Sequence, residues 1–213
     1  MTRPTPPELW AEIIENEQWI TSAHKRGQPL SLPKADWHDL EIVGRVLTGA
    51  QLPGANLDGA NLRDSSLPNA NLRAASLVQA VLDEAMLSEA DLTEAKLAGA
   101  SLRGCLAVNI NLTRADLQKA DLSEAELGKA ALRGANLQEA ILRKADLHKA
   151  VLREARLDGA DLTGARLFQT ILTGATGLDT ARADWIEVGE RNDPQRLEGE
   201  AARQWLLDAA KPS

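Results

Sequence analysis

The chain has 213 residues, enough for one domain, with a net charge of −7 and 44% hydrophobic residues. The chain has one Phe and no Tyr, which argues against a globular core of varied aromatic side chains. The single Cys excludes an intramolecular disulfide, and the acidic balance argues against direct binding to nucleic-acid phosphates.

The chain begins MTRPTPPELW, which lacks the apolar stretch of a secretion signal, and no apolar run approaches the length of a membrane span. We therefore expect a soluble, cytoplasmic protein that does not enter a membrane.

Residues 1–29 are expected to form an N-terminal helical cap. The stretch TPPELWAEIIENEQWI predicts a helix with Thr5 as its N-cap and Pro6 as its first helical residue. Its apolar stripe consists of Leu9, Trp10, Ile13, Ile14 and Ile20.

From residue 47 to residue 172 every fifth position is hydrophobic: 25 of these 26 positions are Leu, and the remaining one is Ala107. Ala stands two residues earlier at 21 of 25 sites, and Asp or Asn precedes the fifth-position residue at 10 of 26. A period of five fits neither an α-helix nor a flat strand. It predicts a chain that turns a corner once per unit, with four units to a coil and Leu and Ala inside. Asp and Asn are expected at the corners.

The frame extends backwards through Leu32, Trp37 and Ile42. Residues 30–46 are therefore predicted to form a degenerate first coil, within a repeat region of residues 30–178 and about seven coils. After Leu172 the five-residue phase breaks.

This A-(D/N)-L-x-x tandem resembles the pentapeptide-repeat proteins. The resemblance implies an all-β solenoid, a right-handed quadrilateral β-helix, and the end segments add short α-helices at both termini. In one branch of that family, members bind DNA gyrase or topoisomerase IV as DNA mimics and protect it from quinolones or peptide inhibitors.

Residues 179–213 are expected to form a C-terminal segment with a helix that starts after Asp193 and Pro194 and covers the open end of the solenoid. One side of that helix carries Leu197, Ala201, Trp205 and Ala209.

No catalytic, cofactor or metal site is predicted. His24, His38 and His148 stand in different contexts without a second ligand at metal-binding spacing, and Cys105 occupies an inward alanine position. We therefore expect a protein that is not an enzyme.

The stretch CLAVNI, residues 105–110, breaks the pattern. Cys105 and Ile110 enlarge two alanine sites while Ala107 reduces a leucine site, which keeps the interior volume. The outer positions beside them are apolar, and the predicted partner surface consists of Met86, Leu106, Val108 and Phe168. The alternatives are that this patch lies under a folded-back end segment or marks a kink. A second apolar column, Ala131, Val151 and Ile171, suits docking of the final helix.

The function favoured by these features is a non-enzymatic scaffold that binds a protein partner. The alternative is a DNA-mimic-like protein that protects gyrase or topoisomerase IV and confers antibiotic resistance. Residues 45–174 carry 15 basic and 16 acidic residues with mixed signs on every side, so a continuous acidic track is not expected. A homodimer formed through an end or the patch is left open.

Overall fold

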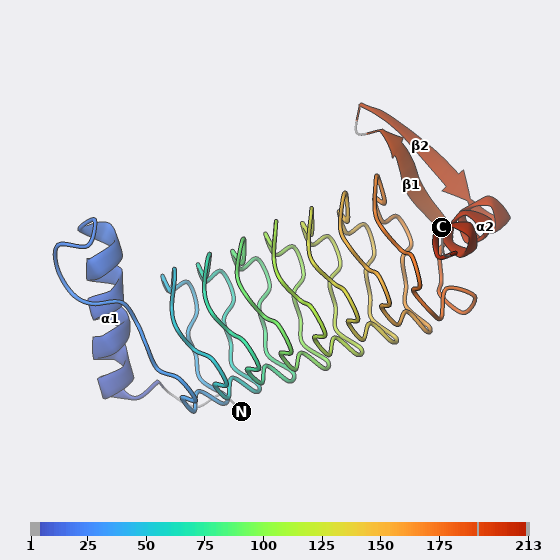
Figure 1. Cartoon of the computed structure of the whole chain (residues 1–213). Coiled ribbons are helices and arrows are strands. Elements are labelled where there is room, and N and C mark those ends of the chain that lie inside the picture. Colours follow the sequence, from blue (N-terminus) through green and yellow to red (C-terminus); the bar gives the residue numbers. More distant parts are fainter. Residues whose placement is uncertain (1–4, 191, 212–213) are drawn as a thin grey trace.

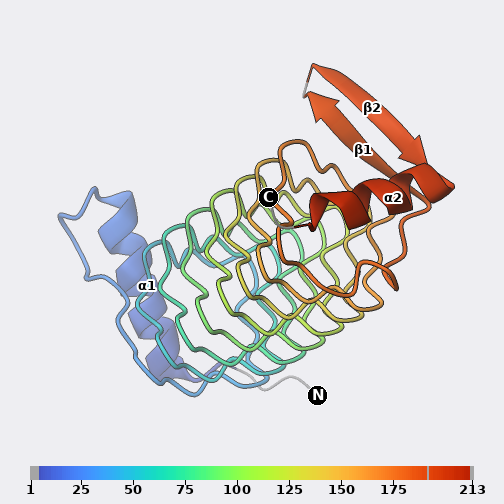
Figure 2. The same ribbon diagram turned by 45° about the vertical axis from the view of Figure 1, so that its right-hand side comes forward.

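The computed structural model describes residues 5–190 and 192–211. Residues 1–4 of the expected N-terminal cap, and residues 191 and 212–213 of the expected C-terminal segment, lie outside this range. The described chain is a rod of stacked coils with helix α1 (Pro7–Thr21) at one end (Figure 1). Strands β1 (Trp185–Glu190) and β2 (Asp193–Glu198) and helix α2 (Gly199–Ala209) lie at the other end (Figure 2).

Neighbouring coils are joined by parallel β-bridges between residues twenty apart, from Ser31↔Gln51 to Arg156↔Thr176. Each bridge is held by two backbone hydrogen bonds. At one of them, the Leu72 N–H donates to the Asp91 carbonyl at 2.8 Å and the Asp91 N–H donates to the Ala70 carbonyl at 2.9 Å. Four bridges per coil give each coil four sides, so the chain is a β-solenoid.

Each five-residue unit turns its corner in the two residues after the leucine. The second of these has a positive φ, as at Asn69 with 58°, and the leucine carbonyl accepts the N–H of the residue three positions later, as from Ala75 to Leu72 at 3.1 Å. This is the pattern of a type II turn. The expectation that the Asp and Asn directly preceding the leucines occupy the corners is wrong, because they occupy the bridge positions. There the Asn56 Oδ1 accepts the Asp58 N–H at 3.2 Å, and the Asn56 amide donates to the Asp36 carboxylate one coil away at 3.0 Å.

Leu and Ala fill the interior of the rod. The leucines of the repeat from Leu47 to Leu172 are at most 2% exposed, and the alanines two residues before them are likewise buried. Cys105, Ala107 and Ile110 are fully buried too, so their exchange of sizes is accommodated inside the coil. The interior is therefore closed along this part of the rod.

Helix α1 covers the first coil with both apolar and polar side chains. Leu9 and Ile13 are buried, but Ile14, expected in the same stripe, is 43% exposed. Asn16 is fully buried; its amide donates to the Val46 carbonyl at 2.9 Å, and its Oδ1 accepts the Leu30 N–H at 2.9 Å. The outer edge of the first coil carries unpaired backbone groups, so a polar residue on the covering helix satisfies them.

The start of α1 differs from the expected cap. Its N-cap is Pro6, not Thr5, and Pro7 is the first helical residue. The Thr5 hydroxyl instead donates to the Glu41 carbonyl on the first coil at 2.7 Å. Thr5 therefore serves the coil edge instead of the helix terminus.

Backbone pairing at the C-terminal end continues past residue 178, the expected limit of the repeat region. A one-residue insertion shifts the last bridges to a separation of twenty-one, Asp161↔Arg182 and Arg166↔Glu187, so the last coil leads directly into β1. Strands β1 and β2 then pair as an antiparallel hairpin.

The expectation of a helix directly after Asp193 and Pro194 is wrong, because residues 193–198 form β2 and α2 begins at Gly199. The buried residues of α2 are Ala202 and Leu206, and its C-cap residue Ala210 accepts the Gly174 N–H at 2.8 Å. Residues 193–198 pair with β1 through backbone hydrogen bonds, and this pairing overrides their local preference for a helix.

Candidate binding face

The solenoid side that contains Ala107 holds all four residues of the predicted partner surface. We call it side A; its inward central residues are 47, 67, 87, 107, 127, 147 and 167. Three columns of its side chains point outward. The bridge column includes Met86, Leu106, Glu126, Asp146 and Arg166. The turn column includes Val108, Gly128, His148 and Phe168, and the corner column includes Asn109, Lys129, Lys149 and Gln169.

Met86 and Leu106 form an exposed apolar pair on side A. They are bridge partners in adjacent coils, and they are 42% and 37% exposed. The described part of the chain has three other large apolar residues that are this exposed, Ile14, Val43 and Ile141. None of these is bridged to another, since Ile141 stands between Asp121 and Asp161 in its own column. Val108, half-buried, lies beside Leu106 along the chain.

Phe168 is separated from that pair by charged residues. Glu126, Asp146 and Arg166 fill the bridge column beyond Leu106, so the four predicted residues do not make one continuous apolar surface. Phe168 and Val108 instead line the two ends of a hollow of about 380 Å³. The hollow is lined in addition by Glu126, Gly128, Lys129, Asp146, His148 and Lys149.

Sequence reasoning did not identify this hollow. One signal for it exists in the sequence. Every other glycine of residues 44–174 stands two residues after a central position, at the corner with positive φ, whereas Gly128 directly follows its central leucine. Its neighbours in the turn column carry side chains, so Gly128 leaves a gap among them.

Elsewhere on the rod, carboxylates are mostly matched by cations. The pattern recurs at Asp91, Asp121 and Asp161, each paired with an arginine eighteen residues earlier. Burial opposes ionisation of Asp121, but hydrogen bonds from Ser123 and Arg103 outweigh it and lower the pKa of this carboxyl. The acidic side chains of the rod are therefore interleaved with arginines, which prevents an uninterrupted negative track.

Cys105 is buried inside the rod, and His24 and His38 have local partners. Burial, with smaller effects of nearby carboxylates, raises the pKa of the Cys105 thiol from 9.0 to about 12, which makes it a poor nucleophile. His24 stacks on Trp19, with ring centroids 4.0 Å apart, and His38 pairs with Asp36 at 2.7 Å. No group of three or more His, Cys, Asp or Glu side chains in the described residues is arranged to hold a metal ion.

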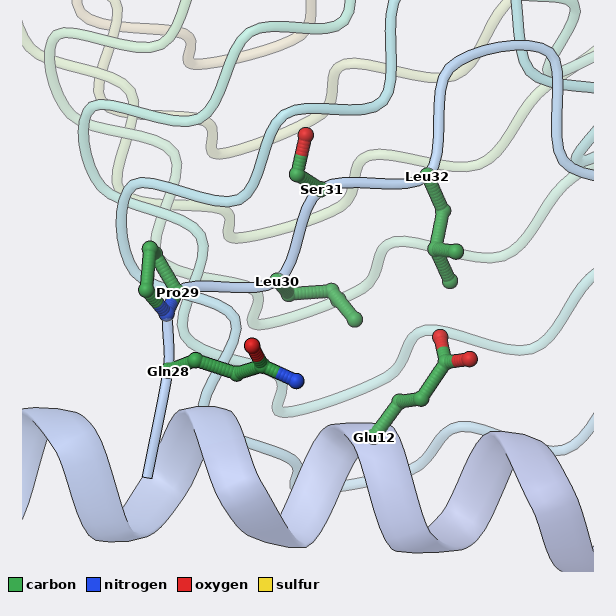
Figure 3. A pocket seen from close by; sticks show the side chains of 6 residues that line it. All are labelled: Glu12, Gln28, Pro29, Leu30, Ser31 and Leu32. Atoms are coloured by element: carbon green, nitrogen blue, oxygen red, sulfur yellow. The ribbon is translucent and has the colours of Figure 1, made fainter. Parts of the chain in front are cut away.

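A second, smaller cavity lies between α1 and the start of the first coil. It measures about 200 Å³ and is lined by Glu12 and residues 28–32. Figure 3 shows Glu12 extending from α1 toward the coil while Leu32 points back toward the helix. No described helix is long and apolar enough to cross a membrane.

The four-sided coils, the five-residue unit and the buried Leu and Ala columns define a parallel β-solenoid built from pentapeptides. The sequence model of the pentapeptide repeats matches eight copies in this chain, over residues 46–77, 65–104, 95–134 and 130–169. The chain belongs to the pentapeptide-repeat family.

Several solved structures are similar to this chain. HetL, a pentapeptide-repeat protein involved in regulating heterocyst differentiation in the cyanobacterium Nostoc sp. strain PCC 7120, is 29% identical; the alignment covers 80% of this chain and 94% of HetL, with a TM-score of 0.47. A trypsin-treated form of QnrB1, a plasmid-mediated fluoroquinolone resistance protein, is 19% identical over 74% of this chain and 80% of QnrB1, with a TM-score of 0.52. The likeness to QnrB1 shows a shared fold. No curated protein sequence matches the chain.

Proposed function

We propose that this pentapeptide-repeat protein is a non-enzymatic scaffold that binds a protein partner through the apolar pair Met86 and Leu106 on side A. The observation that carries the proposal is that two bridged neighbours expose apolar side chains on a rod whose sides are otherwise mostly polar. Removing adjacent apolar side chains from water is the main driving force of protein association. A rigid rod holds the pair in place, so little ordering cost is added on binding.

Affinity capture tests this proposal. The purified chain is used as bait in a lysate of the organism that encodes it, at low and at moderate salt. The test variant is the double substitution Met86→Ser and Leu106→Ser. The matched control is Val43→Ser with Ile141→Ser, which removes similarly exposed apolar side chains from a different side of the rod.

We expect the wild type and the control to retain the same partner at both salt concentrations, because an apolar contact depends weakly on salt. The Met86/Leu106 variant should lose that partner. Retention of the partner by that variant would disprove the proposed contact.

A second candidate function is protection of gyrase or topoisomerase IV, which the shared fold with the resistance protein QnrB1 favours. The interleaved arginines weigh against it, since a DNA mimic needs a continuous negative face. Two results would support it: capture of a topoisomerase subunit that is lost at moderate salt, and restored supercoiling by quinolone-inhibited gyrase when the chain is added. A lack of protection at a molar excess of the chain would reject it.

A further inference from the structure

We propose that the hollow over Gly128 binds the carboxylate of an acidic side chain, carried on an extended segment of the partner protein that also covers Leu106. The inference rests on the proposed scaffold function and names the chemistry of the partner. It follows from the shape of the hollow, its fixed imidazole, its unmatched lysines and its distance from the apolar pair.

Gly128 leaves room for the His148 imidazole in the lining of the hollow. A Cβ built on Gly128 would lie 2.1 Å from Cε1 of His148 and 2.7 Å from its Nδ1, so the imidazole leans over the glycine and occupies the position of a side chain. Val108 and Phe168 bound the space on either side of these two residues. The result is a recess with apolar ends and an imidazole wall.

The imidazole is held in place by a chain of charged groups. The Asp146 Oδ1 lies 3.0 Å from Nδ1 of His148 and accepts the His148 backbone N–H at 3.1 Å. The Asp146 Oδ2 in turn accepts a hydrogen bond from Arg166 at 3.0 Å, and Arg166 lies 3.4 Å from the Glu187 carboxylate on β1. Asp146 is thus already engaged by His148 and Arg166, so its charge is matched within the lining of the hollow.

Two lysines on the edge of the hollow lack the partners that similar lysines have. Lys129 and Lys149 are corner residues of adjacent coils, and neither makes an ion pair within the described part of the chain. At corners on other sides, Lys119 lies 3.6 Å from Glu139, and Lys144 lies 3.2 Å from Glu124. The backbones of these two lysines are one coil spacing apart, roughly 4.8 Å along the rod. Among the described residues, the lining holds one carboxylate without an ion pair, Glu126, against the two lysines, so a partner carboxylate placed at the lysines would complete the charge balance.

The distance to the apolar pair fixes the length of the partner segment. Val108 belongs to both surfaces, since it adjoins Leu106 and lines the hollow. Measured along the rod, the coil of Leu106 and that of Lys149 are two coil spacings apart, about 10 Å, which an extended chain covers in about three residues. A segment that places an apolar side chain on Leu106 therefore brings the third residue onward to the lysines.

The test uses a heptapeptide, acetyl-Leu-Ser-Ser-Glu-Ser-Ser-Leu-amide, which has a leucine three residues from Glu in either direction. The control peptide carries Gln in place of Glu, and glutarate serves as a carboxylate without a peptide. Each is titrated into the full-length, ¹⁵N-labelled chain, and backbone amide shifts are followed by NMR.

We expect the Glu peptide to cause saturable shifts at Leu106, Lys129, His148 and Lys149, with a Kd on the order of 1 mM. The Gln peptide should bind more weakly than the Glu peptide, by a factor of up to about five, as expected for the loss of exposed ion pairs. Glutarate should bind more weakly than the Glu peptide, because it cannot reach Leu106.

Two variants and one matched control locate the binding. Lys129→Gln with Lys149→Gln should reduce the affinity for the Glu peptide to that for the Gln peptide, whereas Lys119→Gln with Lys144→Gln removes the same charge elsewhere and should leave it unchanged. Gly128→Val should abolish the shift at His148. The new side chain has to displace the His148 imidazole. The backbone of the turn column already carries Val at position 108, and unchanged amide signals on the other sides verify folding.

Equal affinity for the Glu and Gln peptides, or no saturable shift at the lysines, would overturn the inference. Shifts confined to Met86 and Leu106 would also overturn it while leaving the scaffold proposal standing. Glutarate binding as tightly as the Glu peptide would assign the hollow to small carboxylates and reject the peptide segment. The scaffold proposal itself is judged separately, by the capture experiment.

Discussion

Replacement of Asn16 by Ala tests whether α1 stabilises the rod by completing the backbone edge of its first coil. Asn16 is fully buried and serves two backbone groups, the Val46 carbonyl and the Leu30 N–H. The substitution leaves both without a partner. Leu30 is 3% exposed, so water reaches its backbone poorly.

The expected loss can be estimated from these contacts. A buried backbone group left unsatisfied costs about 1–3 kcal/mol, and two such groups give roughly 2–6 kcal/mol. Alanine recovers about 0.5 kcal/mol through its higher helix propensity. We therefore expect a net loss of about 1.5–5.5 kcal/mol, and a similar loss for Asn16→Leu, because an apolar side chain supplies neither a donor nor an acceptor.

The loss should be concentrated at the N-terminal end, since coils of a solenoid contact only their neighbours. Urea unfolding followed by tryptophan fluorescence measures the loss, since three of the five Trp, including the buried Trp37, lie in α1 or the first coil. Hydrogen exchange at the Gln51 amide, which bonds to the Leu30 carbonyl, should accelerate more than exchange in the central coils. Gln18→Ala, on the exposed surface of α1, is the control. A loss below about 1 kcal/mol, equal to that of the control, would refute the edge-completion argument.

Four further outcomes are expected. Ala107→Leu should lower the free energy of unfolding by about 1–3 kcal/mol by overpacking a filled coil, and adding Cys105→Ala with Ile110→Ala should recover most of it; urea titration that shows no recovery would contradict volume compensation. The Cys105 thiol, with its pKa raised from 9.0 to about 12, should resist a thiol reagent at pH 8 until the chain unfolds. Because the thiol of the unfolded chain ionises at a lower pH than that of the folded chain, the wild type should lose stability relative to Cys105→Ala as the pH rises. The expected loss is about 1.4 kcal/mol per pH unit between the unfolded and the folded pKa, and curves of unfolding free energy against pH that run parallel for the two proteins would refute this. The lowered pKa of Asp121 means that its stabilisation is present above the unfolded pKa and is lost as the pH falls through the folded pKa. Asp121→Asn should therefore cost about 1 kcal/mol at pH 7 and progressively less in acid, as measured by unfolding at several pH values. Leu206→Ala, at a site 1% exposed, should cost about 2–4 kcal/mol; an unchanged melting temperature would show that α2 does not seal the last coil.

The hollow on side A shows why a candidate site was only partly visible in the sequence. The period of twenty correctly placed Met86 next to Leu106 and put Val108 and Phe168 in one column, since those relations depend only on the fixed coil length. The lean of His148 over Gly128 depends on side-chain rotation, which no periodicity encodes. The charged residues Glu126, Asp146 and Arg166 were visible in the sequence, but only the structure shows that they interrupt the apolar surface between Leu106 and Phe168.

The sequence by itself determined the solenoid and its interior. An uninterrupted five-residue period with Leu and Ala allows one arrangement that buries both, so coil stacking follows from local pattern and steric size alone. The tertiary structure decided how the end segments meet the rod. There the five-residue period stops, and local helical preference competes with backbone pairing. Residues 193–198 form a hairpin with β1 although their sequence favours a helix. Thr5 and Asn16 bond to the open coil edges, because unpaired backbone groups cost more free energy than a lost helix cap or a polar residue in an apolar stripe.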